Sequence, residues 1–195
     1  MTSTTRKRRK KKKRTLPRGL LYGGALLLFV AAGYLLIRAG LPGQPFSSAD
    51  GEPVSDTNFP PLIVERLDGG QFDLQRDHGE ATVLFAMAYW CGTCIPESQA
   101  LATLQNEMGP QGLVVVPVDI DPTSTPDLLN QFIDYASASN LTFVFDSGGA
   151  FVQTFKVRVL DTTIILDAEG NEVYRDQFPT TYETLRAELE KVLGA

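Results

Sequence analysis

The pattern of apolar and polar positions divides the chain into one long apolar segment and a following region of short, alternating elements. Gly19 to Ile37 is a run of 19 residues without a charge. As a helix this run would span roughly 28 Å, close to the thickness of the hydrocarbon core of a bilayer. Tyr22 and Tyr34 lie near its ends, where amphipathic rings favour the membrane interface. We therefore expect a transmembrane helix over residues 19–38.

The apolar positions beyond this segment alternate between the period of strands and that of helices. Polar and apolar residues alternate from Leu62 to Leu74 around the turn Asp68-Gly69-Gly70, which predicts a hairpin. Continuous apolar runs over residues 81–88 and 112–119 predict strands that are buried on both faces. Further elements are expected as helices over residues 94–108, 126–136 and 147–155, a short strand over 141–145, and a hairpin over 162–167 and 172–175. A last helix is expected from a capping box at residues 180–183 to Gly194.

The order of these elements predicts the fold class. Strands and helices alternate first, and a hairpin and a helix close the chain, where Thr180-Thr181-Tyr182-Glu183 reads as a capping box. Crossover connections favour parallel neighbours in the first half of such a sheet. We expect an α/β fold with a mixed central sheet flanked by helices, over residues 62–195, and a flexible, proline-rich linker over residues 39–61.

Charge is distributed very unevenly along the chain. Residues 6–14 are nine consecutive basic residues within the tail 1–18, whereas the part after Arg38 carries 23 acidic and 7 basic residues, a net charge of −16. An acidic domain repels phosphates, so we expect no nucleic-acid partner. The basic run alone fits a nucleic-acid tail, a solvated charge run or a tail beside anionic lipid headgroups.

The adjacent apolar segment favours the membrane interpretation of the basic run. Positive charge before a span places the N-terminus in the cytoplasm and the remainder of the chain outside it. A cleaved signal peptide is the alternative, but its apolar region is usually shorter, and Ile37-Arg38-Ala39 is a poor cleavage site. We therefore expect an uncleaved, single-pass anchor in the lipid bilayer with an extracytoplasmic domain.

Cys91 and Cys94 are the only cysteines, and they lie between a predicted strand and a predicted helix. A cysteine at a helix N-terminus is stabilised as a thiolate by the helix dipole and by unpaired N–H groups. A C-x-x-C at such a junction is typical of a dithiol that cycles with a disulfide. A zinc site usually has four ligands, and besides the two cysteines the chain has only one histidine, His78. We therefore expect no metal, and no cofactor besides the Cys91–Cys94 pair.

These residues resemble the membrane-anchored TlpA/ResA-type thiol-disulfide oxidoreductases, which have the thioredoxin fold. The motif Trp90-Cys91-Gly92-Thr93-Cys94 matches their active site, and Glu97 matches an acid near it. Weaker matches are the N-terminal hairpin with Asn58-Phe59, and Val157 to Thr163, which corresponds to a V-R-G-x-P-T-T segment. The resemblance implies reduction of protein disulfides, with cytochrome c maturation as one setting, and a membrane dithiol as electron donor.

The resemblance also implies roles for particular residues. Cys91 and Cys94 would be catalytic, and Glu97 would handle protons, since Phe85 stands where thioredoxins keep a buried aspartate. Contacts to the substrate would come from five residues, namely Trp90, Gly92, Thr93, Leu160 and Asp161. We expect a reductant, because carboxylates near the sulfurs oppose thiolate formation.

Asp161 stands where the family has a cis-proline. A cis bond before a residue other than proline costs roughly 2.5–4 kcal/mol, so the bond before Asp161 is expected to be trans. This substitution leaves one rival function, a non-enzymatic binding module with the same fold and inert cysteines.

Overall fold

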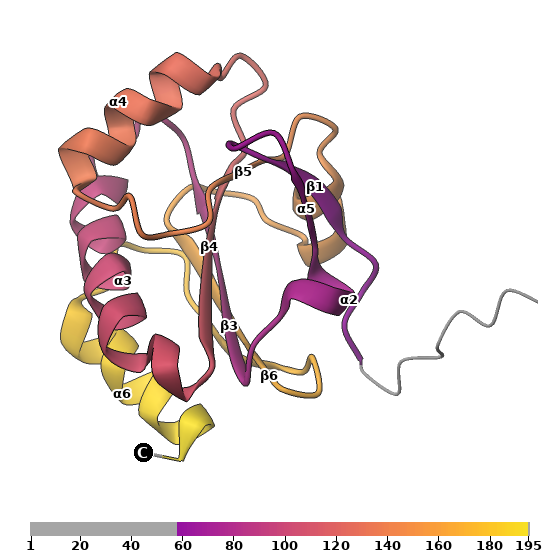
Figure 1. Ribbon diagram of the computed structural model, residues 1–195, viewed down its shortest axis with the longest axis vertical. Helices are drawn as coiled ribbons and strands as arrows, with labels where there is room; N and C mark the ends of the chain where they lie inside the picture. Colours follow the sequence, from indigo (N-terminus) through magenta and orange to yellow (C-terminus); the bar gives the residue numbers. More distant parts are fainter. Residues whose placement is uncertain (1–57, 195) are drawn as a thin grey trace, which may run out of the picture. The chain divides into compact units, whose positions relative to one another are not determined.

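A computed structural model of the protein describes residues 58–194 (Figure 1). The expected basic tail and transmembrane helix, and most of the expected linker, lie outside these residues. Within residues 58–194 there is no helix of the length and apolarity that crossing a membrane requires.

A seven-stranded mixed sheet forms the centre of the described domain, in the order β2-β1-β5-β4-β3-β6-β7. The pairs β3–β4 and β4–β5 are parallel, and the remaining pairs are antiparallel. This arrangement confirms the expected mixed sheet with parallel neighbours among its first crossovers. The strands are β1 (Ile63–Arg66), β2 (Gln71–Asp73), β3 (Ala81–Met87), β4 (Leu113–Asp119), β5 (Val144–Phe145), β6 (Thr162–Asp167) and β7 (Glu172–Arg175).

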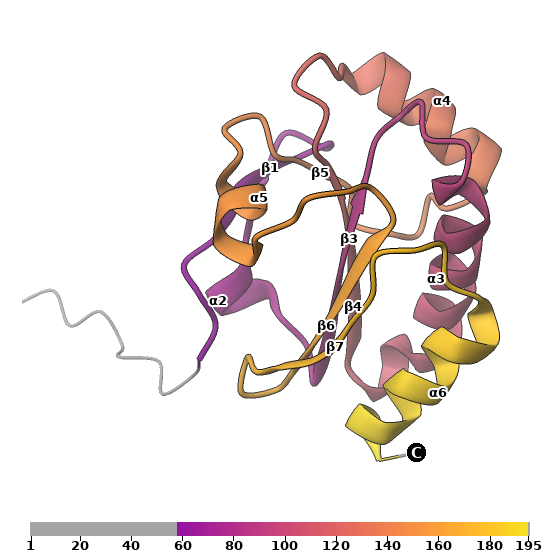
Figure 2. The ribbon, with the colours of Figure 1, turned by 180° about the vertical axis from the view of Figure 1, so that it is seen from behind.

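Helices cover both faces of the sheet (Figures 1 and 2). The three longer helices, α3 (Cys94–Met108), α4 (Pro126–Ala136) and α6 (Tyr182–Leu193), lie on one face. The short helices α2 (Leu74–Asp77) and α5 (Ala150–Phe155) lie on the other face. The flanking helices therefore have the arrangement that the alternating pattern predicts, with α2 as an addition.

Strand β3 is buried on both faces, as its continuous apolar run predicts, and it divides the core into two clusters. Val83, Phe85 and Met87 pack beneath the face of α3, α4 and α6. Leu84 and Ala86 belong to the opposite cluster, with α5 and the N-terminal hairpin. Apolar packing on both sides fixes β3 firmly, so the chain that leaves its carboxyl end toward Cys91 starts from a rigid support.

Some element boundaries differ from the expectation for local reasons. Strand β5 is shorter than residues 141–145, and α5 starts at Ala150 because the Asp146 carboxylate accepts hydrogen bonds from the amides of Phe151 and Val152. The N-cap of α6 is Thr181, whose hydroxyl accepts from the Thr184 amide. Thr180 is not the cap, because its hydroxyl donates to Asp176 instead.

Asn58 and Phe59, within the stretch that the sequence assigns to the linker, make contacts with the folded domain. Phe59 is buried, and the Asn58 amide donates to the Glu169 carbonyl oxygen at 2.6 Å. Gly170 has a φ of +87°, and a Cβ there would lie 2.4 Å from the Phe59 nitrogen. The β6–β7 turn needs glycine at this position because it combines a left-handed conformation with a close approach of two backbones.

Candidate redox active site

Cys91 and Cys94 form a disulfide at the point where β3 leads into α3. Cys91 follows a turn in which its amide donates to the Ala88 carbonyl oxygen at 2.9 Å. The Cys94 amide, in the first turn of α3, donates to Cys91 Sγ at 3.2 Å. The sulfur of Cys91 therefore receives an N–H group at the positive end of a helix, where a thiolate is stabilised.

Asp161 lies beside this disulfide, just before β6. Its amide donates to the Ala86 carbonyl oxygen at 3.0 Å, which holds it against the end of β3. Its carboxylate Oδ1 lies 4.0 Å from Cys91 Sγ, and its Oδ2 accepts a hydrogen bond from the Thr93 hydroxyl at 2.7 Å. The structure thus brings together Cys91, Cys94, Thr93 and Asp161 from two distant parts of the chain.

The backbone at Asp161 adopts an unusual conformation. No peptide bond within residues 58–194 is cis, which confirms the expected trans bond before Asp161. Its φ of +56° lies in the left-handed region, which costs most L-residues about 1–2 kcal/mol and is tolerated best by Gly, Asn and Asp. Residues held in such conformations cluster at functional sites.

Glu97 lies one turn into α3, where its carboxylate joins three parts of the fold. Oε1 accepts from the Thr163 hydroxyl on β6 at 2.5 Å, and Oε2 accepts from the Thr180 amide before α6 at 2.9 Å. The side chain is only 1% exposed. Burial raises the pKa of Glu97 from 4.5 to about 7, with smaller increases from the charges of Asp176 and Asp161.

The position of Glu97 suits proton exchange but provides no direct contact with the disulfide. Within residues 58–194, no hydrogen bond joins its carboxylate to Cys91 or Cys94, and both oxygens already have donors. It lines a pocket of about 630 Å³ with Pro96 and Thr180. A carboxyl with a pKa near neutral beside such a pocket can hold a proton at one pH and release it at another.

The surface around Cys91 carries exposed apolar groups. Trp90 is 60% exposed, and its indole Nε1–H donates to Asp121 Oδ2 at 2.5 Å. Val159 is exposed, and Leu160 is half-buried next to Asp161. Gly92 and Thr93 are also exposed. The expected substrate-contact residues therefore lie around Cys91, which is the more accessible cysteine of the pair, 5% exposed against 0% for Cys94.

Asp119 and Asp121 position Trp90, and they are not among the site residues expected from the sequence. Asp119 ends β4, is buried, and has its pKa raised mainly by burial. Its carboxylate accepts from the Ser124 hydroxyl and from the Asp121 amide, which shapes the loop that holds Asp121. The position of Asp119 at the end of a continuous apolar run was the signal in the sequence that could have identified it. The carboxyl ends of parallel strands meet at one edge of a sheet, so an acid there lies close to the end of the neighbouring strand.

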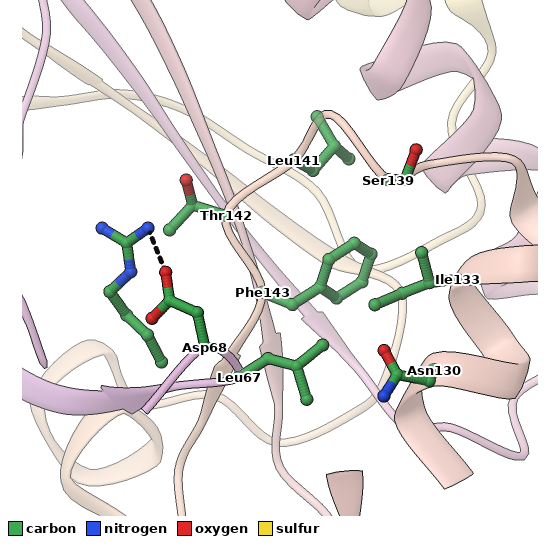
Figure 3. A pocket seen from close by; sticks show the side chains of 9 residues that line it. Leu67, Asp68, Asn130, Ile133, Ser139, Leu141, Thr142 and Phe143 are labelled. Atoms are coloured by element: carbon green, nitrogen blue, oxygen red, sulfur yellow. Dashed lines mark hydrogen bonds and ion pairs between the residues drawn. The ribbon is translucent and has the colours of Figure 1, made fainter. Parts of the chain in front are cut away.

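Two other features lie away from the sulfurs. A pocket of about 460 Å³ lies between the β1 end and α4, with Asp68, Asn130 and Phe143 in its wall (Figure 3). Its lining includes none of the expected site residues. His78 stacks on Phe59 with ring centroids 4.0 Å apart, just before β3 begins.

Comparisons with known proteins agree with this geometry. The Redoxin family matches residues 49–193. The thiol-disulfide oxidoreductase ResA of Bacillus cereus is 24% identical over 166 residues, which cover 81% of this chain and 92% of that protein. A Streptomyces lividans protein described as mercury resistance operon ORF3 is 29% identical over 101 residues, which cover 51% of this chain and about half, 53%, of that protein.

Solved structures show the same fold. A putative thiol:disulfide interchange protein DsbE from Chlorobium tepidum superimposes with a TM-score of 0.62, at 22% identity, over 69% of this chain and 94% of that one. In this chain the Cys91–Cys94 disulfide lies where β3 leads into α3. The chain therefore belongs to the Redoxin family, as a thioredoxin-fold thiol-disulfide oxidoreductase of the TlpA/ResA type.

Proposed function

We propose that this protein reduces disulfides of other proteins outside the cytoplasm, tethered to the membrane by residues 19–38. The observation that carries the proposal is the environment of Cys91. Cys91 is the more accessible residue of the pair, its Sγ accepts a hydrogen bond from the Cys94 amide, and it lies among the exposed Trp90, Gly92 and Thr93. These properties suit the sulfur that attacks a substrate.

In the reduced enzyme, the Cys91 thiolate attacks one sulfur of a substrate disulfide. The S–S bond of the substrate breaks, its other sulfur leaves as a thiolate that takes up a proton, and a mixed disulfide with Cys91 forms. The thiolate of Cys94 then attacks Cys91 Sγ and releases the second substrate thiol. Two electrons pass to the substrate, and the enzyme ends as the Cys91–Cys94 disulfide. A membrane dithiol that becomes a disulfide returns it to the reduced form.

The direction of the reaction follows from the charges beside the sulfurs. Strong oxidants of this class gain their potential from a stabilised thiolate in the reduced form. Asp161 lies 4.0 Å from Cys91 Sγ, and its charge opposes that stabilisation. We expect a reduction potential well below the value of about −120 mV of the oxidant DsbA. Equilibration with glutathione buffers measures this potential, and a value near that of DsbA would reverse the proposed direction.

Glu97 acts in this proposal as a positioning residue that exchanges protons with solvent. Its contacts to Thr163 and Thr180 fix the first turn of α3, and its pKa of about 7 lets it change protonation near neutrality. Cytochrome c maturation is the cellular setting that the ResA-type relationship suggests, with oxidised haem-binding proteins as substrates.

Insulin reduction by the full-length chain in detergent tests the activity. The wild type is expected to turn over, Cys91→Ser to show no cysteine-dependent turnover, and the exposed control Ala187→Ser to match the wild type. Absence of turnover in the reduced wild type would favour the alternative, a binding module with inert cysteines.

Trapping in whole cells with Cys94→Ser identifies direction and partner. This variant cannot resolve the mixed disulfide, so substrates should accumulate as covalent adducts of Cys91. The same variant tests location, because Cys91 is then the only thiol in the chain. A membrane-impermeant maleimide added to spheroplasts should label it without lysis. Labelling only after lysis would place the domain in the cytoplasm.

A further inference from the structure

Three side chains with metal-binding atoms meet at the start of α3. The sulfurs of Cys91 and Cys94 and a carboxylate oxygen of Asp161 all lie within 4.8 Å of one another, and all three residues are buried. Asp161 follows Cys91 by 70 positions in the chain. Counting cysteine and histidine along the sequence therefore misses the third group, which only the fold brings to the other two.

The carboxylate of Asp161 has one oxygen that no donor within residues 58–194 reaches. Thr93 has a single hydroxyl proton, and it goes to Oδ2 at 2.7 Å. Oδ1 faces Cys91 Sγ, but a sulfur in a disulfide carries no hydrogen to donate. Asp161 is only 8% exposed, and no Lys or Arg within residues 58–194 forms an ion pair with it. A buried anionic oxygen is therefore directed at the two sulfurs.

We propose that the reduced form of this site binds one divalent cation of the zinc class through Cys91, Cys94 and Asp161. Zinc accepts both thiolate sulfur and carboxylate oxygen, whereas magnesium and calcium avoid sulfur, and copper(I) prefers sulfur ligands alone. Three protein ligands leave the fourth tetrahedral position for a water molecule or a group of a partner. Binding in this site is a property beyond the proposed reductase activity and does not depend on turnover.

The distances are close to those that a tetrahedral ion requires. Zinc bonds of about 2.3 Å to sulfur and about 2.1 Å to oxygen place sulfur and oxygen about 3.6 Å apart, and two sulfurs about 3.8 Å apart. Asp161 Oδ1 is already 4.0 Å from Cys91 Sγ. The two sulfurs separate once the bond between them is reduced, and C-x-x-C is a spacing common among zinc ligands.

Charge balance gives a reason for the cation. Binding displaces one proton from each thiol to solvent, so two thiolates and one carboxylate surround the ion. Three negative charges on ligand atoms that lie within 4.8 Å of one another would repel strongly, and the cation offsets this repulsion. With a divalent ion the site carries a net charge of −1. The bound sulfurs are then unavailable for attack on a disulfide and protected from oxidation.

Titration of the reduced full-length chain tests the proposal, with Zn²⁺ and with Co²⁺ as a spectroscopic probe. The chain is reduced with a phosphine under argon, and thiol counting confirms two free thiols before each titration. The variants are Asp161→Asn, which removes the charge but keeps the shape, and Asp161→Cys, which offers a softer ligand. Asp134→Asn, exposed on α4, is the matched control for loss of one charge.

The wild type and Asp134→Asn are expected to bind one Zn²⁺ per chain, with both thiols protected from alkylation, and to give the visible bands of tetrahedral Co²⁺. Asp161→Asn should bind Zn²⁺ at least about ten-fold more weakly, because even the loss of a residue that only hydrogen-bonds to a metal ligand lowers metal affinity by that factor. Asp161→Cys should bind more tightly and show stronger thiolate-to-cobalt absorption. If Asp161→Asn misfolds by circular dichroism, the gain in Asp161→Cys carries the test.

Lack of saturable binding by the reduced wild type would overturn the proposal, as would equal affinities of wild type, Asp161→Asn and Asp161→Cys. Insulin reduction measured on the same preparations separates the two proposals. Turnover without zinc binding would overturn the metal site alone. Zinc binding without turnover would overturn the reductase function alone. If both hold, one equivalent of Zn²⁺ should suppress turnover, and a chelator should restore it.

Discussion

At the scale of single residues, two buried carboxylates set the properties of the site, and they do so differently. Asp161 faces the sulfur of Cys91 and acts on it through its charge. Glu97 contacts Thr163 and Thr180, and burial raises its own pKa. The first therefore affects thiol reactivity, and the second affects the pH dependence of the domain.

Replacing Asp161 with Asn is expected to raise the rate at which iodoacetamide alkylates reduced Cys91 at neutral pH by about ten-fold or more. A charge 4.0 Å away raises the free energy of the thiolate by about 1 kcal/mol in water and about 4 kcal/mol at an effective dielectric of 20. Stopped-time alkylation followed by mass spectrometry measures the rate, with Asp134→Asn as the control. A slower rate in Asp161→Asn would show that the carboxylate assists thiolate formation instead.

Replacing Glu97 with Gln is expected to change how stability depends on pH. The pKa of Glu97 rises from 4.5 to about 7 on folding, so the folded chain holds this proton more tightly. That contribution is complete below about pH 4.5 and is lost as the pH rises through about 7. Gln can keep both hydrogen bonds, because its oxygen accepts from Thr180 and its amide donates to Thr163.

Urea unfolding at several pH values measures this effect. The unfolding free energy of the wild type relative to Glu97→Gln should fall by roughly 3 kcal/mol between about pH 4.5 and pH 8. Parallel profiles for the two proteins would show that Glu97 keeps an ordinary pKa in the folded chain. The rate of insulin reduction plotted against pH should show an inflection near pH 7 for the wild type, and Glu97→Gln should lose it.

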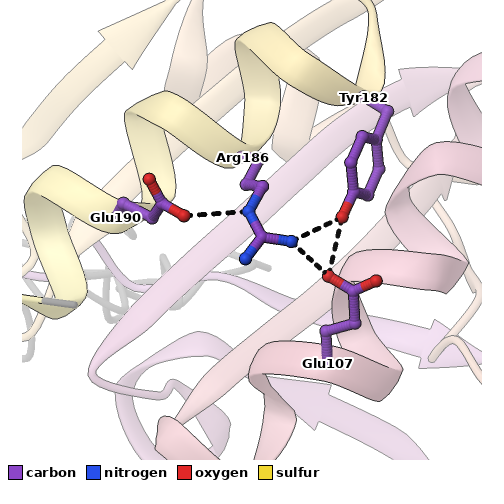
Figure 4. A network of polar contacts seen from close by, with 4 residues as sticks. All are labelled: Glu107, Tyr182, Arg186 and Glu190. Carbon is purple, nitrogen blue, oxygen red and sulfur yellow. Dashed lines mark hydrogen bonds and ion pairs between the residues drawn. The ribbon is translucent and has the colours of Figure 1, made fainter.

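At the scale of elements, both apolar burial and polar contacts hold α6 against the rest of the domain. Leu185 and Leu189 are fully buried beneath it. On its outer side, Arg186 contacts Glu107 of α3 and Glu190, and the Tyr182 hydroxyl also donates to Glu107 (Figure 4). The hydrogen bond to Tyr182 and the nearby acids raise the pKa of Arg186.

Two substitutions in α6 separate these contributions. Leu185→Ala is expected to lower the unfolding free energy by about 2–5 kcal/mol, because it leaves a cavity in the core. Arg186→Ala should lower it much less, because the ion pairs are solvent-exposed. Urea denaturation of both variants gives the comparison. A larger loss from Arg186→Ala would assign the docking of α6 to the polar network.

At the scale of the whole molecule, the negative charge of the chain is expected to favour cationic substrates over anionic ones. The part after Arg38 carries 23 acidic and 7 basic residues. Such a field accelerates encounters with cationic partners and slows those with anionic ones. Asp161 beside Cys91 and Asp121 beside Trp90 place part of this field at the site itself.

Disulfide-linked peptides with either Lys or Glu flanking the cysteines test this selection. At low ionic strength the Lys peptide is expected to be reduced about ten-fold faster, because the unscreened field favours its approach. The two rates should converge at about 1 M salt, where the screening length is about 3 Å. Equal rates at low salt, or a difference that salt leaves unchanged, would exclude electrostatic steering.

The sequence by itself determined the mixed α/β fold and the cysteine pair. Both rest on signals that are local in the chain: continuous apolar runs for β3 and β4, helical spacing after Cys94, and two cysteines at a strand–helix junction. The expected membrane span has the same local character, and it stays a prediction because residues 19–38 lie outside the described part. Two boundaries differ from the prediction, because the cap at Thr181 and the start of α5 depend on which oxygen accepts a hydrogen bond from a given amide.

Only the tertiary structure decided what surrounds the sulfurs. Asp161 reaches Cys91 because β6 pairs antiparallel with β3, and Asp121 reaches Trp90 because β4 lies parallel to β3 on the other side. Glu97 owes its raised pKa to burial between α3, β6 and the start of α6, which no pattern around residue 97 reveals. Contacts between distant residues depend on strand order and register, and these are set by packing of the whole domain.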